Sequence, residues 1–320
     1  MTIVALHHTD KDMFAIADGL ISRGDRRVIA EDQKIVLFTP RYKIPQVRLG
    51  HFDGFSEYAG GSYGLAYAGN YTIVSTIVKR FTDIVNRLLV IDRESAEGGK
   101  PTIYQRDNAH DYFRSCSYDD TYNFDRDELL PITVNFLMNI LQRVSTKACT
   151  DFAANAMERP DAHFAIFGAD KIGHDSMNRC QILKCLNAAH GTLVFERFSA
   201  LPWHLNCIGD ASVIPRLITT IESTSQYAIP PVVPPSKPTD YELFDGEEST
   251  AFSAWIRKDS IDANWRKMRE AVIEQEVLRL IAQQVGTIGG DCTIARSSWM
   301  SRLATQTISH STISARFPHE

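Results

Sequence analysis

Two apolar stretches near the start of the sequence, TIVALH (2–7) and MFAIADGLIS (13–22), decide the fold. Each has the length of one strand, and the polar residues TDKD (9–12) between them predict a turn, so the chain opens with a hairpin. Short apolar runs bounded by turn residues predict further strands at 34–38, 63–69, 163–169, 179–188, 192–199, 204–211 and 290–297.

Apolar residues at helical spacing predict helices between and after these strands. We expect them at 71–91, 127–157, 213–223 and 261–284. The stretch 41–62, rich in glycine and aromatic residues, is expected to be a surface loop. Because strands and helices do not alternate regularly, the sequence predicts an α+β fold, a four-layer αββα sandwich of two antiparallel sheets.

The proline-dense stretch AIPPVVPPSKPTDYELFDGEEST (228–250) is the clearest break in composition. Its prolines favour an extended, semi-rigid segment. We therefore predict one domain from residues 1–223 and 261–310, a proline-rich insertion at 224–260 and a C-terminal tail at 311–320.

The composition is that of an ordinary globular protein. Of 320 residues 44% are hydrophobic and 23% charged, and the net charge is −5. A mild negative charge gives no reason to bind nucleic acid or an anionic membrane surface. No apolar run reaches the ~18 residues of a membrane span, and no secretory signal is evident, so a cytoplasmic location is expected.

No cofactor or metal site is predicted. Six cysteines are scattered without metal-type spacing, which favours free thiols. His7 and His8, with Asp10 and Asp12, could bind a metal, but adjacent strand residues point to opposite faces. We expect these four residues to lie on the surface of a turn.

Several short motifs resemble proteasome β subunits, and especially the HslV-type bacterial proteases. The segment DGLISRGDRRVIAEDQKI (18–35) carries Asp18, Gly19 and Lys34 at the family's spacing. GLAYAGN (64–70), CIGDAS (207–212) and IGGDCTIARSS (288–298) resemble three later family segments in the same order. The stretches 41–62, 91–125 and 224–260 have no counterpart in that family.

The resemblance implies an N-terminal threonine nucleophile. Removal of Met1 would leave Thr2 with a hydroxyl and a free α-amine, and an amine with a pKa of ~7.7–8.0 can act as the base. Lys34 would stabilise the alkoxide, Asp18 would orient Lys34, and the Gly69 N–H would form the oxyanion hole. Asp210 stands where the family has a serine near the amine.

Each of these residues also has a structural explanation: Asp18 and Gly69 could be turn residues, and Lys34 a solvated charge. The family begins T-T-I-V and this chain M-T-I-V, so aligning on Ile3 puts Met1, rather than Thr2, in the nucleophile position. We favour Thr2 because its spacing to Asp18 is what a hairpin preserves.

The resemblance therefore predicts a cytoplasmic threonine peptidase that cleaves peptides or unfolded proteins inside a self-assembled ring. It also implies an AAA+ unfoldase partner. Two alternatives remain open at this point: a catalytically inactive ring or scaffold subunit, and an amidase acting on a small molecule.

Overall fold

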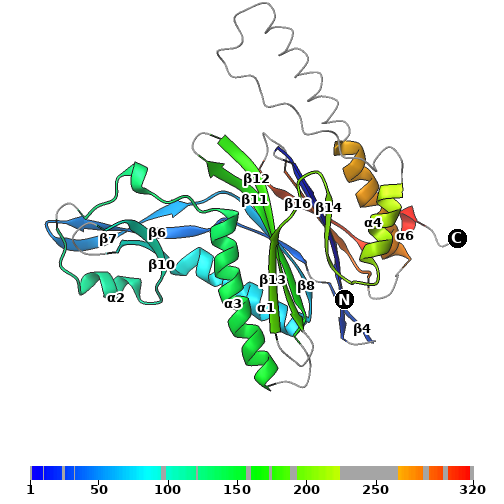
Figure 1. Ribbon diagram of the computed structural model, residues 1–320, viewed down its shortest axis with the longest axis horizontal. Coiled ribbons are helices and arrows are strands. Elements are labelled where there is room, and N and C mark those ends of the chain that lie inside the picture. The colour runs from blue at the N-terminus through cyan, green and yellow to red at the C-terminus, as the bar shows by residue number, and fades with distance from the viewer. Residues whose placement is uncertain are drawn as a thin grey trace, which may run out of the picture.

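The computed structural model describes residues 2–9, 11–23, 26–31, 33–94, 99–119, 122–155, 160–172, 175–187, 193–223, 266–283, 288–297 and 302–317. The predicted α+β class is confirmed, with two large antiparallel sheets and helices packed against them (Figure 1). The predicted insertion at 224–260 lies outside the described residues, and the domain boundaries stay a prediction.

The first large sheet is built around the N-terminal hairpin. Its strand order is β14-β1-β2-β15-β16, and all four pairings are antiparallel. The strands are β1 (Ile3–His8), β2 (Met13–Asp18), β14 (Leu205–Gly209), β15 (Cys292–Ser297) and β16 (Ala304–Ile308). β1 and β2 are buried on both faces, which explains why their sequences are apolar at nearly every position.

The second large sheet has the order β13-β12-β11-β8-β5, and it is also antiparallel throughout. Its strands are β5 (Ile35–Phe38), β8 (Tyr63–Gly69), β11 (Ala162–Ile172), β12 (Asp175–Asn187) and β13 (Leu193–Ser199). A separate short hairpin, β3 (Leu20–Arg23) with β4 (Arg26–Glu31), follows β2.

Small side chains separate the two large sheets. Val4 and Leu6 of β1, with alanines of β2, pack against alanines and Phe167 of the second sheet in one buried cluster. Alanine at facing positions lets two sheets approach closely while the remaining space is filled by larger side chains. The side chains on this face of β1 therefore point toward the second sheet.

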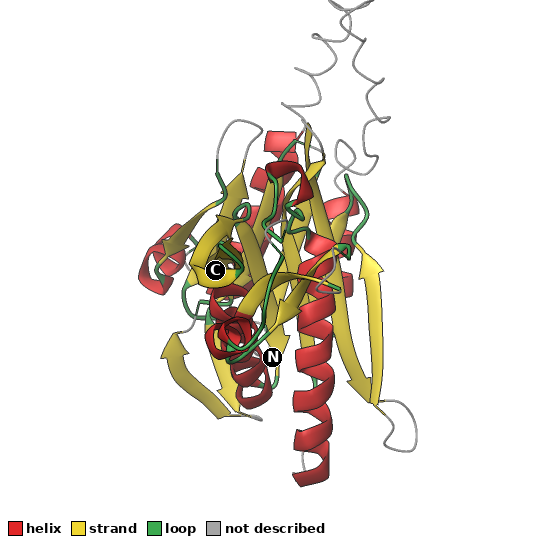
Figure 2. Cartoon of the chain, turned by 90° about the vertical axis from the view of Figure 1, so that its left-hand side faces the viewer, coloured by secondary structure: helices red, strands yellow, loops and turns green. Residues whose placement is uncertain are grey.

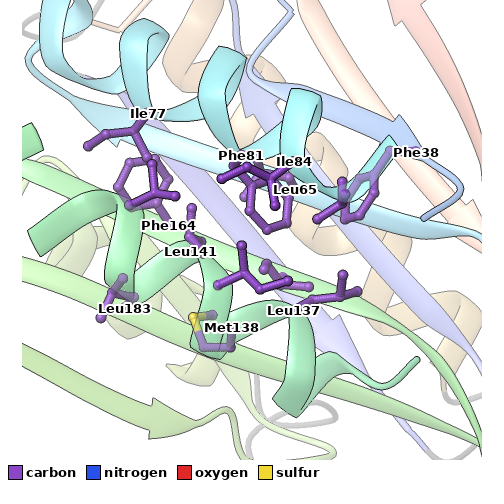
Figure 3. Close-up of a cluster of buried hydrophobic side chains, with 14 of the residues drawn as sticks. Phe38, Leu65, Ile77, Phe81, Ile84, Leu137, Met138, Leu141, Phe164 and Leu183 are labelled. Carbon is purple, nitrogen blue, oxygen red and sulfur yellow. The ribbon is translucent and has the colours of Figure 1, made fainter. Parts of the chain in front are cut away.

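Helices cover the outer faces of both sheets (Figure 2). Outside the second sheet lie α1 (Tyr71–Asp83) and α3 (Val134–Asn155), whose apolar faces meet β8, β11 and β12 in the largest cluster (Figure 3). Outside the first sheet lie α4 (Ile214–Ser223), a helix at 266–282 and α6 (His310–Arg316). Among the described residues, no helix has both the length and the apolar character needed to cross a membrane.

The expected surface loop at 41–62 is wrong. The stretch forms a hairpin of β6 (Arg41–Arg48) and β7 (His51–Ala59), whose turn contains Leu49 and Gly50 at positive φ. β6 alternates between more exposed and buried positions from Arg41 to Ile44, and Pro45 and the bulge at Gln46–Val47 then interrupt the alternation. A proline inside the run favours a loop in the sequence.

The helix predicted at 71–91 ends earlier than expected. α1 gives way to a π-helical turn at Ile84–Leu88, and Leu89–Arg93 then forms strand β9. β9 pairs with β10 (Pro101–Gln105) on one side and, in parallel, with β6 on the other. The apolar run 84–91 fits a buried helix or a buried strand equally well, so periodicity alone could not place the boundary.

The helix predicted at 127–157 begins later than expected. Only Arg126–Glu128 forms a 3₁₀ turn, and α3 starts at Val134, three residues after Pro131. The Asp170 carboxylate, 36 positions away, accepts the Val134 N–H at 2.7 Å and so caps this end of the helix. A cap supplied from a distant strand leaves no local signal in the sequence.

The segments 41–62 and 91–125 meet in one projecting arm. It consists of the sheet β10-β9-β6-β7 with α2 (Ala109–Arg114) beside it, and it extends to the left in Figure 1. Val47, Val90, Ala109, Phe113 and Tyr122 form its own small core. Two stretches without a counterpart in the resembling family are thus halves of one structural unit.

Candidate functional site

The N-terminal end of β1 brings together Thr2, Asp18 and Lys34. The Lys34 ammonium donates a hydrogen bond to the Thr2 hydroxyl oxygen, and its Nζ lies 3.4 Å from the nearer Asp18 carboxylate oxygen. All three residues are buried, at 4% exposed or less. The three residues that the motif resemblance named therefore lie in one spatial cluster.

The Thr2 side chain lies on the inner face of the first sheet. Thr2, Val4 and Leu6 alternate with Ile3 and Ala5 along β1, and the even-numbered residues belong to the cluster between the sheets. Lys34 immediately precedes β5 of the second sheet and reaches Thr2 from that side. The apolar residues after Thr2 could not fix this orientation from the sequence.

Lys34 has all three ammonium hydrogens engaged. Besides Thr2 and Asp18, its Nζ donates to the backbone carbonyl of Leu20. An ammonium group has three donors and no acceptor, so in this arrangement Lys34 cannot accept the proton of the Thr2 hydroxyl. It can stabilise negative charge on that oxygen.

The Asp18 carboxylate is held by backbone groups as well as by Lys34. Its two oxygens accept the N–H groups of Ile3 at 2.9 Å and Gly289 at 3.3 Å. Burial raises the pKa of Asp18, and the Lys34 ammonium and the two N–H groups oppose that rise. Asp18 therefore fixes both the lysine and the first residues of β1 in place.

Asp210 lies next to Thr2 along the edge of the sheet. Its backbone N–H donates to the Thr2 carbonyl at 2.8 Å, and its carboxylate accepts from the N–H and hydroxyl of Ser212 at 2.9 and 2.6 Å. The preceding Gly209 has φ +118°, and a Cβ there would lie 1.8 Å from the Thr2 carbonyl oxygen. Only glycine allows β14 to approach the start of β1 so closely.

Gly69 ends β8 with φ +119°, and a Cβ there would lie 2.2 Å from the Asp161 carbonyl oxygen. Two residues earlier, Tyr67 donates its N–H to the Lys34 carbonyl at 3.1 Å. Because N–H groups alternate between the two edges of a strand, the Gly69 N–H points to the edge of β8 on which Lys34 lies.

The expectation for His7 and His8 is wrong. Both are buried, at 1% and 4% exposed, because β1 continues through His8 and is covered on both faces. Burial is the largest cause that lowers the pKa of His7 to about 3 and of His8 to about 4. Within the described residues, no group of three or more His, Cys, Asp and Glu side chains could hold a metal ion.

Sequence reasoning missed the backbone groups that complete the Thr2 cluster: the Leu20 carbonyl and the Gly289 N–H. Both are backbone groups, which every residue type carries, so the sequence gives no signal for them. The glycine motif IGG (288–290) was part of the motif resemblance, and in the structure the Gly289 N–H donates a hydrogen bond to the buried Asp18 carboxylate.

Comparisons with known proteins give little. No family model matches the chain, and no curated protein matches it. Among solved structures, a Gly-1 mutant of Anbu from Hyphomicrobium sp. strain MC1 is similar at a TM-score of 0.45 and 9% identity, over 99% of this chain and 93% of that chain. A similarity at this level supports no conclusion about activity.

The assignment to proteasome β subunits and HslV-type proteases is therefore wrong. Neither the family models nor the curated proteins return that family, and the solved structure reported above is an Anbu. The motifs behind the assignment are short runs of strand and turn residues, such as AG and IGG, which close approaches in many β folds require. What remains is the geometry around Thr2.

Proposed function

We propose that the chain hydrolyses amide bonds through Thr2, once processing has made Thr2 the first residue. One observation carries the proposal: a buried ammonium that has no proton-accepting capacity donates directly to the Thr2 hydroxyl. The base must then be another group, and the α-amine of Thr2 itself is the nearest candidate by covalent connection.

The proposed reaction uses each neighbour in one role. The Thr2 oxygen attacks the substrate carbonyl while its proton passes to the Thr2 amine, and Lys34 stabilises the oxygen as charge develops on it. The Gly69 N–H donates to the tetrahedral oxyanion. The amine returns the proton to the leaving nitrogen as the C–N bond breaks, and water then hydrolyses the ester on Thr2.

Peptides are the proposed substrates, because β14, which lies beside Thr2, is an edge strand among the described residues and offers backbone groups that an extended chain can pair with. A ring assembly and an unfoldase partner followed only from the abandoned family assignment, and they stay untested predictions, as does the cytoplasmic location. We also infer a four-layer αββα order from three buried clusters: one lies between the two sheets, and each of the other two lies between a sheet and its helices.

A covalent probe tests the proposal. A peptide epoxyketone forms its ring adduct only where one residue carries both the hydroxyl and a free amine. We expect intact-mass analysis of the purified full-length protein to show removal of what precedes Thr2, and peptide mapping to place the adduct on Thr2. A processed protein that gives no adduct, or a chain that keeps methionine before Thr2, would contradict the hydrolase and support an inactive scaffold subunit.

A further inference from the structure

A polar cavity lies at the end of β1 that is opposite to Thr2. It has a volume of about 370 Å³ and lies where β12, the end of β1 and the first turn of α3 meet. Pockets for small molecules have volumes of roughly 300–1,000 Å³. His8 lines it, six residues along the same face of β1 from Thr2, so the two places are about 20 Å apart.

Two buried polar side chains at this cavity lack partners. The His8 Nδ1 is buried without a hydrogen bond to any residue that the structure describes. Asn178 is only 6% exposed as a residue, and its side chain makes no hydrogen bond within the described part of the chain, so its amide is available to the cavity that it lines. Buried polar groups are nearly always paired, so the His8 nitrogen indicates that something else occupies the cavity.

The cavity also presents one charge of each sign. Arg179 is an exposed residue of β12, and its side chain makes no ion pair or hydrogen bond with the described residues. Burial is the largest cause that raises the pKa of Asp170, and the nearby Arg179 guanidinium opposes that rise. Asp170 uses one carboxylate oxygen to cap α3 and to meet the Tyr63 hydroxyl at 3.5 Å. Its other oxygen has no partner among the described residues.

The rim of the cavity is apolar. Ala200, Leu201 and Pro202 lie along it, between the end of β13 and the start of β14. Leu201 is 61% exposed and offers an apolar surface against which an apolar group of a ligand can pack.

We propose that this cavity binds a small zwitterion with an aliphatic side chain, an α-amino acid such as leucine. Its carboxylate would pair with Arg179, its ammonium with the free oxygen of Asp170, and its side chain would lie on Leu201. Asn178 and His8 would complete the hydrogen bonds. A simple anion would be repelled by Asp170, and a simple cation by Arg179.

Calorimetric titration of the full-length protein with three probes tests the charge pattern. L-Leucine carries both charges, N-acetyl-L-leucine lacks the ammonium, and L-leucinamide lacks the carboxylate. We expect saturable binding of leucine, and binding at least about tenfold weaker for each analogue, because each leaves one charged group of the site unpaired. Absence of saturable leucine binding, or equal binding of an analogue, would overturn the proposal.

Two variants locate the binding. Arg179→Gln should abolish leucine binding, and Lys171→Gln, which removes an exposed charge on the neighbouring strand β11, should not. Asp170→Asn keeps an oxygen to cap α3 and removes the negative charge, so it should weaken leucine binding and strengthen that of N-acetyl-leucine. Unchanged leucine binding in a folded Arg179→Gln protein would place the ligand elsewhere.

This proposal does not depend on chemistry at Thr2. None of the probes or variants touches Thr2, Lys34 or Asp18, so epoxyketone labelling provides a separate readout on the same samples. Leucine binding without labelling would support the cavity proposal and contradict the hydrolase. Labelling without leucine binding would support the hydrolase and contradict the cavity proposal.

Discussion

The two ends of β1 differ in how the polar groups around them are hydrogen-bonded. At the Thr2 end, Lys34 and Asp18 are paired with each other and with backbone groups. At the His8 end, a buried histidine nitrogen has no hydrogen bond to the described residues, and the side chains of Asn178 and of the exposed Arg179 line the same cavity. The first arrangement fixes a single geometry, and the second leaves polar groups available to a ligand. We call the Thr2 end of β1 the preorganised end and the His8 end, whose polar groups are available to a ligand, the receptive end.

The largest expected effect is the loss of reactivity at the preorganised end. Thr2→Ala removes the hydroxyl and should abolish epoxyketone labelling completely, because no nucleophile remains. Thr2→Ser is the matched control: it keeps hydroxyl and amine and should retain labelling. Mass spectrometry of the treated protein measures both. Labelling that survives in Thr2→Ala would remove Thr2 from the chemistry.

The next effect is on stability. Lys34→Met leaves the Asp18 carboxylate buried without its ammonium, which should lower the free energy of unfolding by about 3–5 kcal/mol in urea denaturation. Lys79→Met, at an exposed position of α1, should change it little. Adding Asp18→Asn to Lys34→Met should recover part of the loss, since no unpaired charge then remains.

The pH dependence of the Lys34→Met variant gives a second check. Without the ammonium, burial leaves the pKa of Asp18 above its unfolded value, so the folded state binds a proton more readily. Its stability relative to the parent should then rise as the pH falls toward the usual carboxylate range. A pH-independent difference would mean that Asp18 is not the group left unpaired.

His8 predicts acid sensitivity at the receptive end. Its pKa is lowered to about 4 in the folded state, so protonation favours unfolding. Its contribution to stability is present above about pH 6.5 and is lost as the pH falls toward about 4, by up to about 3 kcal/mol at ~1.4 kcal/mol per pH unit. His8→Gln should flatten the unfolding free energy over this range, whereas His51→Gln, on exposed strand β7, should not.

The smallest expected effect concerns Gly69. Gly69→Ala combines a positive φ with a contact of 2.2 Å to Asp161, and should cost about 1–3 kcal/mol together with slower labelling of Thr2. Gly54→Ala is the matched control: its φ is +148°, but nothing lies within 4 Å of the added atom. Equal losses in thermal unfolding would mean that backbone strain, and not the approach to Asp161, decides the effect.

The strands of the two large sheets could be predicted because their sequences are short, apolar and bounded by turn residues. The motif resemblance named Thr2, Asp18 and Lys34 together, and they lie in one cluster. The β6–β7 hairpin could not be predicted because a proline and a bulge interrupt the alternation of β6, and β9 could not because its apolar run also fits a helix. The cavity beside His8 escaped notice because Asp170, Asn178 and Arg179 converge only through the pairing of β11 with β12.

The projecting arm makes two distant parts of the chain dependent on each other. Val47 of β6 packs with Phe113 of α2, and the Asn123 side chain both accepts from and donates to the Val47 backbone, at 2.9 Å in each case. Deletion of either segment alone would expose aromatic side chains of the remaining segment and leave its strand edges without hydrogen-bond partners. Anyone shortening this protein would have to excise both segments in one step, and a natural relative should possess the pair or lack the pair.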